Sequence, residues 1–462
     1  MTTAPQTTGP RTAPGPRGRL LLGNMHHIRR RPLEFYTSLR RQYGDVVRFR
    51  TTGPFHAFLL SHPDDVEYVL RKNAKNYPKE EFVNAKLKLF LGEGMLTSEG
   101  GFWLRQRRLA QPTFHRQRLA ALATLMTGAT RAMLARWEPD AGSGRPLDVA
   151  DEMARLTLGI VGRALLGVDL SEEAGALGCA FEVALEHVNH RSTHMLAMPE
   201  RIPTPRNRRF LVARRKLDEA VYRIIAGRRR SGEDTGDLLS MLLAARDEET
   251  GEGMSDRQLR DEVVTILIAG YETTADALAW TWYLLGAHPE VEARLHAELA
   301  AVLAGRAPTV EDLPQLPYTR MVLQEAMRLY PPAWGLLRQV REDDEIRGYR
   351  IPARARIVIS QYVVHRHPGF WKEPEQFDPE RFAPGFVASR PPYAYFPFGG
   401  GQRMCIGNNF AMMEAQLILA TVAQRYRLDL VPGHPVEPEP LITLRPRHGV
   451  MVTLHDRHKP EG

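Results

Sequence analysis

The sequence is poor in features that mark several classes of protein. It has 2 cysteines among 462 residues, which excludes a disulfide scaffold and a cysteine-rich zinc site. No stretch approaches the roughly 18 consecutive apolar residues of a membrane span, and no apolar segment precedes a cleavage site at the N-terminus. We therefore expect a soluble, cytoplasmic protein without a membrane anchor.

Lysine is also scarce, because 8 of the 62 basic residues are lysine and the others are arginine. A net charge of +8 raises nucleic acid as a partner. The arginines are spread along the chain, however, and local groups such as residues 228–230 suit the solvated face of a helix. We expect a monomer that binds no nucleic acid.

The remaining composition is that of a globular protein, with 43% hydrophobic and 25% charged residues. Residues 1–19 are rich in proline, glycine and threonine and hold almost nothing to bury, which predicts a flexible tail. No internal repeat or long linker divides the rest of the chain. We predict a single domain over residues 20–462.

Helical spacing of apolar residues dominates the chain and predicts a mainly α fold with a small β portion. Alternating patterns predict strands at 46–50 and 56–60 and a hairpin formed by 346–351 and 354–360. A proline-rich, aromatic meander follows from 365 to 398. The predicted helices cover residues 32–43, 119–137, 149–166, 210–230, 255–286, 289–305, 317–330 and 408–426.

The longest predicted helix has a clear start. The Ser255 hydroxyl can cap its first turn while Gln258 reaches back, and the centre of the helix, 263–270, is apolar nearly all round. We expect that centre to be buried. Gly270 costs helix stability, so we expect it to leave room for a ligand and the helix to open locally there.

Cys405 lies in a glycine-rich turn that leads into the last predicted helix. A helix N-terminus and a nearby arginine stabilise a thiolate, so we expect a lowered thiol pKa. Two interpretations stay open on these residues alone: a reactive or ligating thiolate, and a small buried hydrophobic side chain. For Cys179 we expect a structural thiol in the core.

The turn reads Phe398-Gly-Gly-Gly-Gln-Arg403-Met-Cys405-Ile-Gly407, and it resembles the haem-binding signature of the cytochrome P450 family. The resemblance implies a cytochrome P450 fold, with haem b between the long helix and the cysteine loop. It implies that the Cys405 thiolate binds the iron. Arg403 would bind a haem propionate, and Phe398, Gly399 and Gly407 would lie against the cofactor.

Further motifs follow in the order that the family shows. Glu325 and Arg328 are three residues apart on one helical face, and with Arg381 they resemble the family's structural Glu-Arg-Arg triad. By themselves such residues are a common surface pair. Trp103 and Arg107 resemble its Trp-x-x-x-Arg pair, and these two residues and Arg338 are implied to contact haem propionates. The remaining motif resembles the family's oxygen-activation motif. It comprises Ala269, Gly270, Glu272 and Thr273.

The resemblance implies a monooxygenase that places one oxygen atom from O₂ into a hydrophobic terpenoid, polyketide or fatty-acid-like natural product of secondary metabolism. Glu272 and Thr273 would deliver protons, and the reaction would be a hydroxylation or an epoxidation. Electrons would come from a separate ferredoxin or flavodoxin with its reductase.

Two alternatives stay open within the family. One is a non-catalytic haem-thiolate sensor or recruitment protein. The other is a peroxide-using or rearranging member. The intact pair of Glu272 and Thr273 argues against both.

Overall fold

The computed structural model describes residues 11–52, 55–114, 116–170, 173–194, 197–246 and 251–457. Contacts among these residues divide the chain into two compact units. The first contains the residues up to Val83, Trp334–Pro374 and Arg390–Met404, and the second contains Asn84–Ala333, Glu375–Ser389 and the chain from Cys405 onward. The single domain expected from the sequence stays a prediction.

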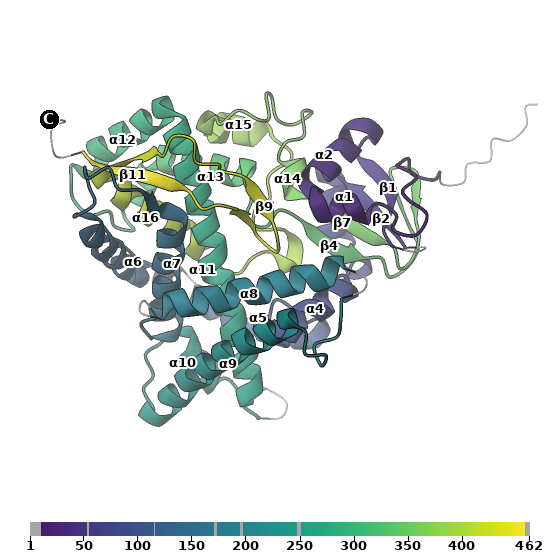
Figure 1. Ribbon diagram of the computed structural model, residues 1–462, viewed down its shortest axis with the longest axis horizontal. Coiled ribbons are helices and arrows are strands. Elements are labelled where there is room, and N and C mark those ends of the chain that lie inside the picture. The colour runs from purple at the N-terminus through teal and green to yellow at the C-terminus, as the bar shows by residue number, and fades with distance from the viewer. Residues whose placement is uncertain are drawn as a thin grey trace, which may run out of the picture. The chain divides into compact units, whose positions relative to one another are not determined.

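The first unit is built on a four-stranded sheet. Its strand order is β1-β2-β7-β4, in which β7 is parallel to β2 and the other pairs are antiparallel (Figure 1). Strands β1 and β2 both have the predicted bounds, but burial alternates only in β1, while residues 57–60 of β2 are all buried. The elements are α1 (Met25–Arg30), α2 (Pro32–Tyr43), β1 (Val46–Arg50), β2 (His56–Leu60), α3 (Pro63–Glu67), η1 (Tyr68–Lys72), η2 (Ala74–Asn76), β4 (Leu336–Gln339), β5 (Asp344–Ile346), β6 (Tyr349–Ile351), β7 (Arg356–Ile359), α14 (Gln361–Val364) and η6 (Gly401–Arg403).

The hairpin predicted from residues 346–351 and 354–360 is wrong. Residues 344–351 form their own two-stranded hairpin, in which β5 and β6 meet at Arg347 and Gly348. Both turn residues have positive φ, 53° and 76°, which is the geometry of the tightest hairpin turns. The strand β7 therefore joins the larger sheet instead.

The N-terminal segment is part of the first unit from residue 11 onward. The Arg11 N–H donates to the Gly348 carbonyl at 2.9 Å, the Arg48 N–H donates to the Pro14 carbonyl at 2.8 Å, and Ala13 is buried. The sequence predicts a flexible tail over residues 1–19. In the structure, the chain already packs against the first unit from residue 11 onward. Residues 1–10 of that tail lie outside the described residues.

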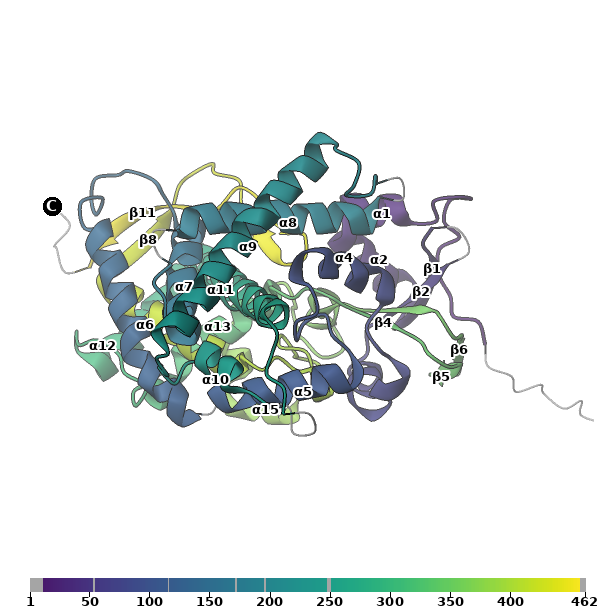
Figure 2. The same ribbon diagram turned by 90° about the horizontal axis from the view of Figure 1, so that it is seen from below.

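The second unit is helical and is organised around α11. This helix is seen nearly end-on in Figure 2, where α7 and α9 lie beside it, and it also contacts α13 and α16. α4 (Glu81–Leu91) crosses from the first unit into the second. The remaining elements are α5 (Gly100–Ala110), η3 (Gln111–Phe114), α6 (Arg116–Trp137), β3 (Leu147–Asp148), α7 (Val149–Leu166), α8 (Ala174–Thr193), α9 (Pro205–Ser231), α10 (Leu238–Ala244), α11 (Asp256–Ala287), α12 (Pro289–Leu303), η4 (Leu313–Gln315), α13 (Pro317–Leu329), η5 (Pro379–Phe382), α15 (Pro384–Ser389), α16 (Asn408–Arg425), β8 (Tyr426–Leu430), β9 (Pro438–Pro440), β10 (Leu444–Pro446) and β11 (Met451–Asp456).

The start of α11 is confirmed in detail. The Ser255 hydroxyl accepts from the Gln258 N–H, and the Gln258 side chain accepts from the Ser255 N–H. The helix runs for 32 residues and most of its side chains are buried. Across the described ranges, no helix combines the length and apolar character that crossing a membrane requires.

Candidate active site

Cys405 precedes α16 and belongs to the second unit. The residue keeps exposed surface although many protein atoms surround its sulfur, and the Gly407 N–H hydrogen bonds the sulfur. A Cβ atom on Gly407 would lie 4.0 Å from the sulfur, which is ordinary van der Waals contact. Cys405 is therefore a reachable thiol held at the start of a helix.

Burial raises the pKa of the Cys405 thiol, while the Gly407 N–H and the charge of Arg107 lower it. The lowered pKa expected from the sequence is therefore wrong in direction. The loss of hydration of a thiolate among surrounding protein atoms outweighs the two stabilising contacts. Cys179 also departs from expectation, because its side chain is exposed on α8 instead of buried in the core.

The short helix α5 brings Arg107 into electrostatic reach of Cys405. Trp103 lies one turn earlier on this helix and is 7% exposed. Arg107 is half-buried, and burial lowers its pKa. The spacing predicted for these residues is thus realised on one helical face. Arg105 is half-buried and Arg108 is exposed.

The centre of α11 carries a short accessible stretch. Residues 259–268 are all buried, whereas Ala269 is exposed and Thr273, one turn later, is half-buried. The Thr273 Oγ1 donates to the Ala269 carbonyl at 2.8 Å. The helix stays continuous through this stretch, so the local opening expected at Gly270 is absent.

Gly270 has a packing role in α11. A Cβ atom on Gly270 would lie 2.9 Å from a methyl group of Val161 on α7. The missing side chain therefore lets α7 and α11 approach closely, which explains the glycine without an opening in the helix.

Glu272 is half-buried and turns toward the C-terminal strands of the second unit. Its Oε1 accepts from the Thr443 hydroxyl at 2.8 Å. Burial raises the pKa of Glu272 to about 7, and the Thr443 hydrogen bond and the charge of Arg445 oppose that shift. Burial and the charge of Glu272 also raise the pKa of Asp276, one turn along α11.

Arg445 connects this carboxyl pair to the surface. Its Nη1 donates to Glu182 of α8 at 2.7 Å, its Nε donates to Glu439 at 3.0 Å, and the Glu182 side chain is 46% exposed. Sequence reasoning missed Thr443, Arg445, Glu182 and Asp276. Residue patterns carry no signal for them, because Thr443 and Glu272 are separated by 171 positions.

The predicted triad is assembled in the second unit. Arg328 makes two hydrogen bonds to Glu325, with Nε–Oε2 at 2.6 Å and Nη2–Oε1 at 2.7 Å, and both side chains are fully buried. Arg381 lies 3.3 Å from the same carboxylate, and the Asp378 N–H donates to it at 3.0 Å. Arg328 also donates to the Gln376 carbonyl at 2.9 Å. The carboxylate ties α13 to the segment around η5.

The other predicted site residues lie in the first unit. Arg338 is on β4, where its Nη1 donates to the Leu337 carbonyl at 2.9 Å. Arg403 ends η6, and Phe398 and Gly399 precede it, with φ +71° at Gly399. A Cβ atom on Gly401 would lie 1.9 Å from the Leu70 carbonyl, so the turn fits only without a side chain there.

Comparison with known proteins agrees with this geometry. A cytochrome P450 family model matches residues 13–453. The chain is 42% identical over 431 residues to cyclooctat-9-en-7-ol 5-monooxygenase of Streptomyces melanosporofaciens, covering 93% of this chain and 91% of the relative. It is 40% identical over 442 residues to cyclooctatin synthase of the same organism, covering 95% of each chain.

Among solved structures, the haem domain of cytochrome P450DA resembles the chain with a TM-score of 0.88 and 27% identity, over 97% of this chain and 99% of that one. The mainly α fold with its small β portion is thereby confirmed. The chain belongs to the cytochrome P450 family and is a haem-thiolate monooxygenase.

Proposed function

We propose that this enzyme uses a haem held by the Cys405 thiolate to place one oxygen atom from O₂ into a hydrophobic terpenoid. The observation that carries the proposal is the reachable Cys405 sulfur beside the Gly407 N–H and Arg107. The substrate class rests on the name of a relative, which acts on cyclooctat-9-en-7-ol.

The residues of the second unit fit a haem. The donor set offers one accessible thiol at a glycine turn, and a thiolate would hold the haem iron. The helix α11 is the other element of the site, and its buried surface is interrupted by the exposed Ala269. The small side chain of Ala269 would let a flat cofactor and O₂ approach the helix there. When bound, the haem supplies the reductive activation of O₂.

The Cys405 sulfur would hold the iron, and iron binding replaces the proton that burial otherwise keeps on the thiol. Trp103 and Arg107 of α5 would bind haem propionates, together with Arg338 and Arg403 of the first unit. Guanidinium groups suit this task because they donate two parallel hydrogen bonds to a carboxylate. Phe398, Gly399 and Gly407 would line the cofactor. We assign haem b as the form bound.

Glu272 would carry protons toward the reaction. A carboxyl with a pKa of about 7 exchanges protons readily at neutral pH, and the hydrogen bond to Thr443 holds its position. Arg445 and Glu182 extend the polar path to the surface. Thr273 follows Glu272 on α11, beside Ala269. Its hydroxyl would hold the reacting oxygen in place and pass the proton on to it. Gly270 keeps α11 close to α7.

Electrons would come from a separate ferredoxin or flavodoxin with its reductase. The half-buried Arg105 and exposed Arg108 of α5 offer positive charge to an acidic donor. The enzyme would bind no nucleic acid and would act as a cytoplasmic monomer.

The test is turnover of cyclooctat-9-en-7-ol with a surrogate ferredoxin, its reductase and reduced nicotinamide. We expect consumption of the nicotinamide that depends on the terpenoid and yields a product heavier by one oxygen atom. Haem binding without turnover would favour the sensor alternative, and turnover with peroxide but not with reductant would favour a peroxide-using enzyme. Either result would overturn the proposal.

A further inference from the structure

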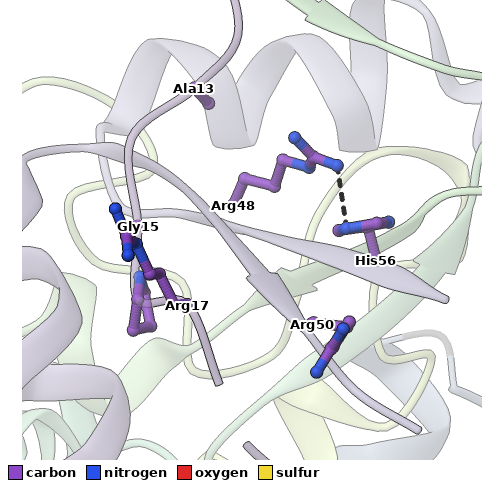
Figure 3. Close-up of a pocket in the computed structure, with 7 residues that line it drawn as sticks. Ala13, Gly15, Arg17, Arg48, Arg50 and His56 are labelled. Carbon is purple, nitrogen blue, oxygen red and sulfur yellow. Dashed lines mark hydrogen bonds between the residues drawn. The ribbon is translucent and has the colours of Figure 1, made fainter. Parts of the chain in front are cut away.

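A cavity outside the candidate active site is lined by four basic side chains and three small apolar residues of the first unit. Its volume is about 260 Å³. Figure 3 shows Arg48 and Arg50 on β1, His56 on β2 and Arg17 on the N-terminal segment around it. The lining residues are Ala13, Gly15, Pro16, Arg17, Arg48, Arg50 and His56.

Strand geometry places three of these side chains on one face of the sheet. Residues 48 and 50 are two apart on β1, and Arg50 pairs directly with His56 on β2. The intervening Phe49 points to the opposite face, where it is buried. The alternation of the strand therefore gathers the two guanidinium groups and the imidazole at one place.

The N-terminal segment closes the other side of the cavity. The Arg48 N–H donates to the Pro14 carbonyl at 2.8 Å. A Cβ atom on Gly15 would lie 1.8 Å from the Arg48 carbonyl, so only glycine allows this approach. The approach brings Arg17 to the rim of the cavity.

The positive charge of the cavity is uncompensated. Its lining contains no carboxylate, and among the described residues Arg17, Arg48 and Arg50 form no ion pair. Arg48 donates to a ring nitrogen of His56 at 2.8 Å. The Nε of Arg50 is a buried donor without an acceptor in the described part of the chain. The N-terminal segment adds no negative charge, since Glu34 is the first acidic residue in the chain.

We propose that this cavity binds a phosphate-class oxyanion. Like charges on neighbouring strand positions repel one another, and a bound anion removes that cost. Guanidinium groups bind phosphate oxygens through paired, charge-assisted hydrogen bonds. The volume is below the range of about 300–1,000 Å³ for drug-sized ligands, so the bound group is compact.

The phosphate can belong to a free ion or to a lipid headgroup. A loop next to the cavity gives a reason to test the second source. Arg19 and Gly23 close this loop with two backbone hydrogen bonds, each 2.9 Å, and Arg50 hydrogen bonds the Arg19 carbonyl. At its tip, Leu20 and Leu21 are 85% and 76% exposed. Exposed leucines beside arginines suit the surface of an anionic bilayer.

The experiment uses the full-length holoprotein and measures two kinds of binding at fixed ionic strength. Inorganic phosphate is titrated by calorimetry. Cosedimentation is measured with phosphatidylcholine vesicles that contain or lack phosphatidylglycerol. The test variants are the double variant Arg48→Gln and Arg50→Gln, and Arg17→Gln, whose exposed side chain leaves folding intact. Arg257→Gln, an exposed arginine of α11, is the control.

We expect the double variant to weaken binding at least tenfold, Arg17→Gln to weaken it several-fold, and the control to match wild type. Phosphate binding with this pattern identifies a free ion as ligand. Binding only to phosphatidylglycerol vesicles with this pattern identifies a headgroup, and Leu21→Ser should then weaken it further. Absence of both kinds of binding, or binding that Arg17→Gln and the double variant leave unchanged, would overturn the proposal.

Discussion

Two glutamates of the second unit, one half-buried and one fully buried, have different hydrogen-bond partners. Glu325 of α13 is fully buried, and two arginines and a backbone N–H occupy its oxygens. Glu272 of α11 has one neutral donor, Thr443, and an acidic neighbour, Asp276. Burial raises the pKa of both carboxyls, but two adjacent guanidinium groups oppose the shift at Glu325.

The difference separates a structural carboxylate from a chemical one. A carboxylate that accepts from several charged donors is held in one position, so it fixes elements in space. A carboxyl with a pKa of about 7 and a single neutral donor exchanges its proton at neutral pH. Glu325 therefore holds α13 in position, whereas Glu272 is suited to move protons.

The largest effect should follow removal of the structural charge. Glu325→Gln leaves the buried Arg328 and the partly buried Arg381 without their carboxylate, and breaking a buried pair costs about 3–5 kcal/mol. We expect lower unfolding free energy and little haem-loaded protein, measured by denaturant titration and haem absorbance. The control is Arg294→Gln, which breaks an exposed pair with Glu380 and should cost less than about 1 kcal/mol. Equal stability of the two variants would contradict the comparison.

Removal of the chemical carboxyl should preserve the fold and slow the reaction. Glu272→Gln keeps the hydrogen bond to Thr443 but carries no acidic proton, so we expect turnover to fall by about 10²-fold. The matched control is Glu292→Gln on α12, because burial also raises the pKa of Glu292 to about 7. Product formation per minute at equal haem content measures both. A similar loss in the control would remove any special role of Glu272.

The pH dependence of stability should differ between wild type and Glu272→Gln. The carboxyl has a pKa of about 7 in the folded chain and 4.5 in its ordinary state, so the folded protein binds more protons between these values. Wild type should therefore lose stability as pH rises from about 5 to about 7. The variant should lose less. Melting temperatures across this range measure the difference, and parallel curves would refute the raised pKa.

The smallest effect should follow a change at Thr443. Its hydroxyl donates to Glu272 and lowers the pKa of that carboxyl, so Thr443→Val should move the pH midpoint of turnover upward. We expect turnover at neutral pH to change only a few-fold, since the carboxyl remains. Thr443→Ser should restore the wild-type midpoint. A midpoint that does not respond to Thr443→Val would show that this hydrogen bond leaves the proton-carrying group untouched.

Local rules predicted the parts of the fold that depend on neighbouring residues. The capping box at Ser255 and the three-residue spacing of Glu325 and Arg328 are local, and both are realised. The helix α8 lies inside the helix-rich region expected over residues 149–230, but its own bounds were not predicted, since Gly175 and Gly178 lower its intrinsic propensity. The N-terminal segment was also assigned to a tail, although Ala13 is buried.

Contacts between residues far apart in the chain could not be predicted from the sequence patterns. Thr443 and Arg445 meet Glu272 and Glu182 because two short C-terminal strands pack near α8 and α11, which spacing along the chain cannot encode. The role of Gly270 was misjudged for the same reason. The side chain that it accommodates, Val161, belongs to another helix.

The assignment of Cys405 as the iron ligand is tested most directly by the absorption spectrum of the reduced, carbon monoxide-bound protein. We predict the red-shifted Soret band of thiolate ligation in wild type and in Cys179→Ser, which removes the other cysteine. Cys405→Ser should lose that band. A red-shifted band that persists in Cys405→Ser would contradict the assignment.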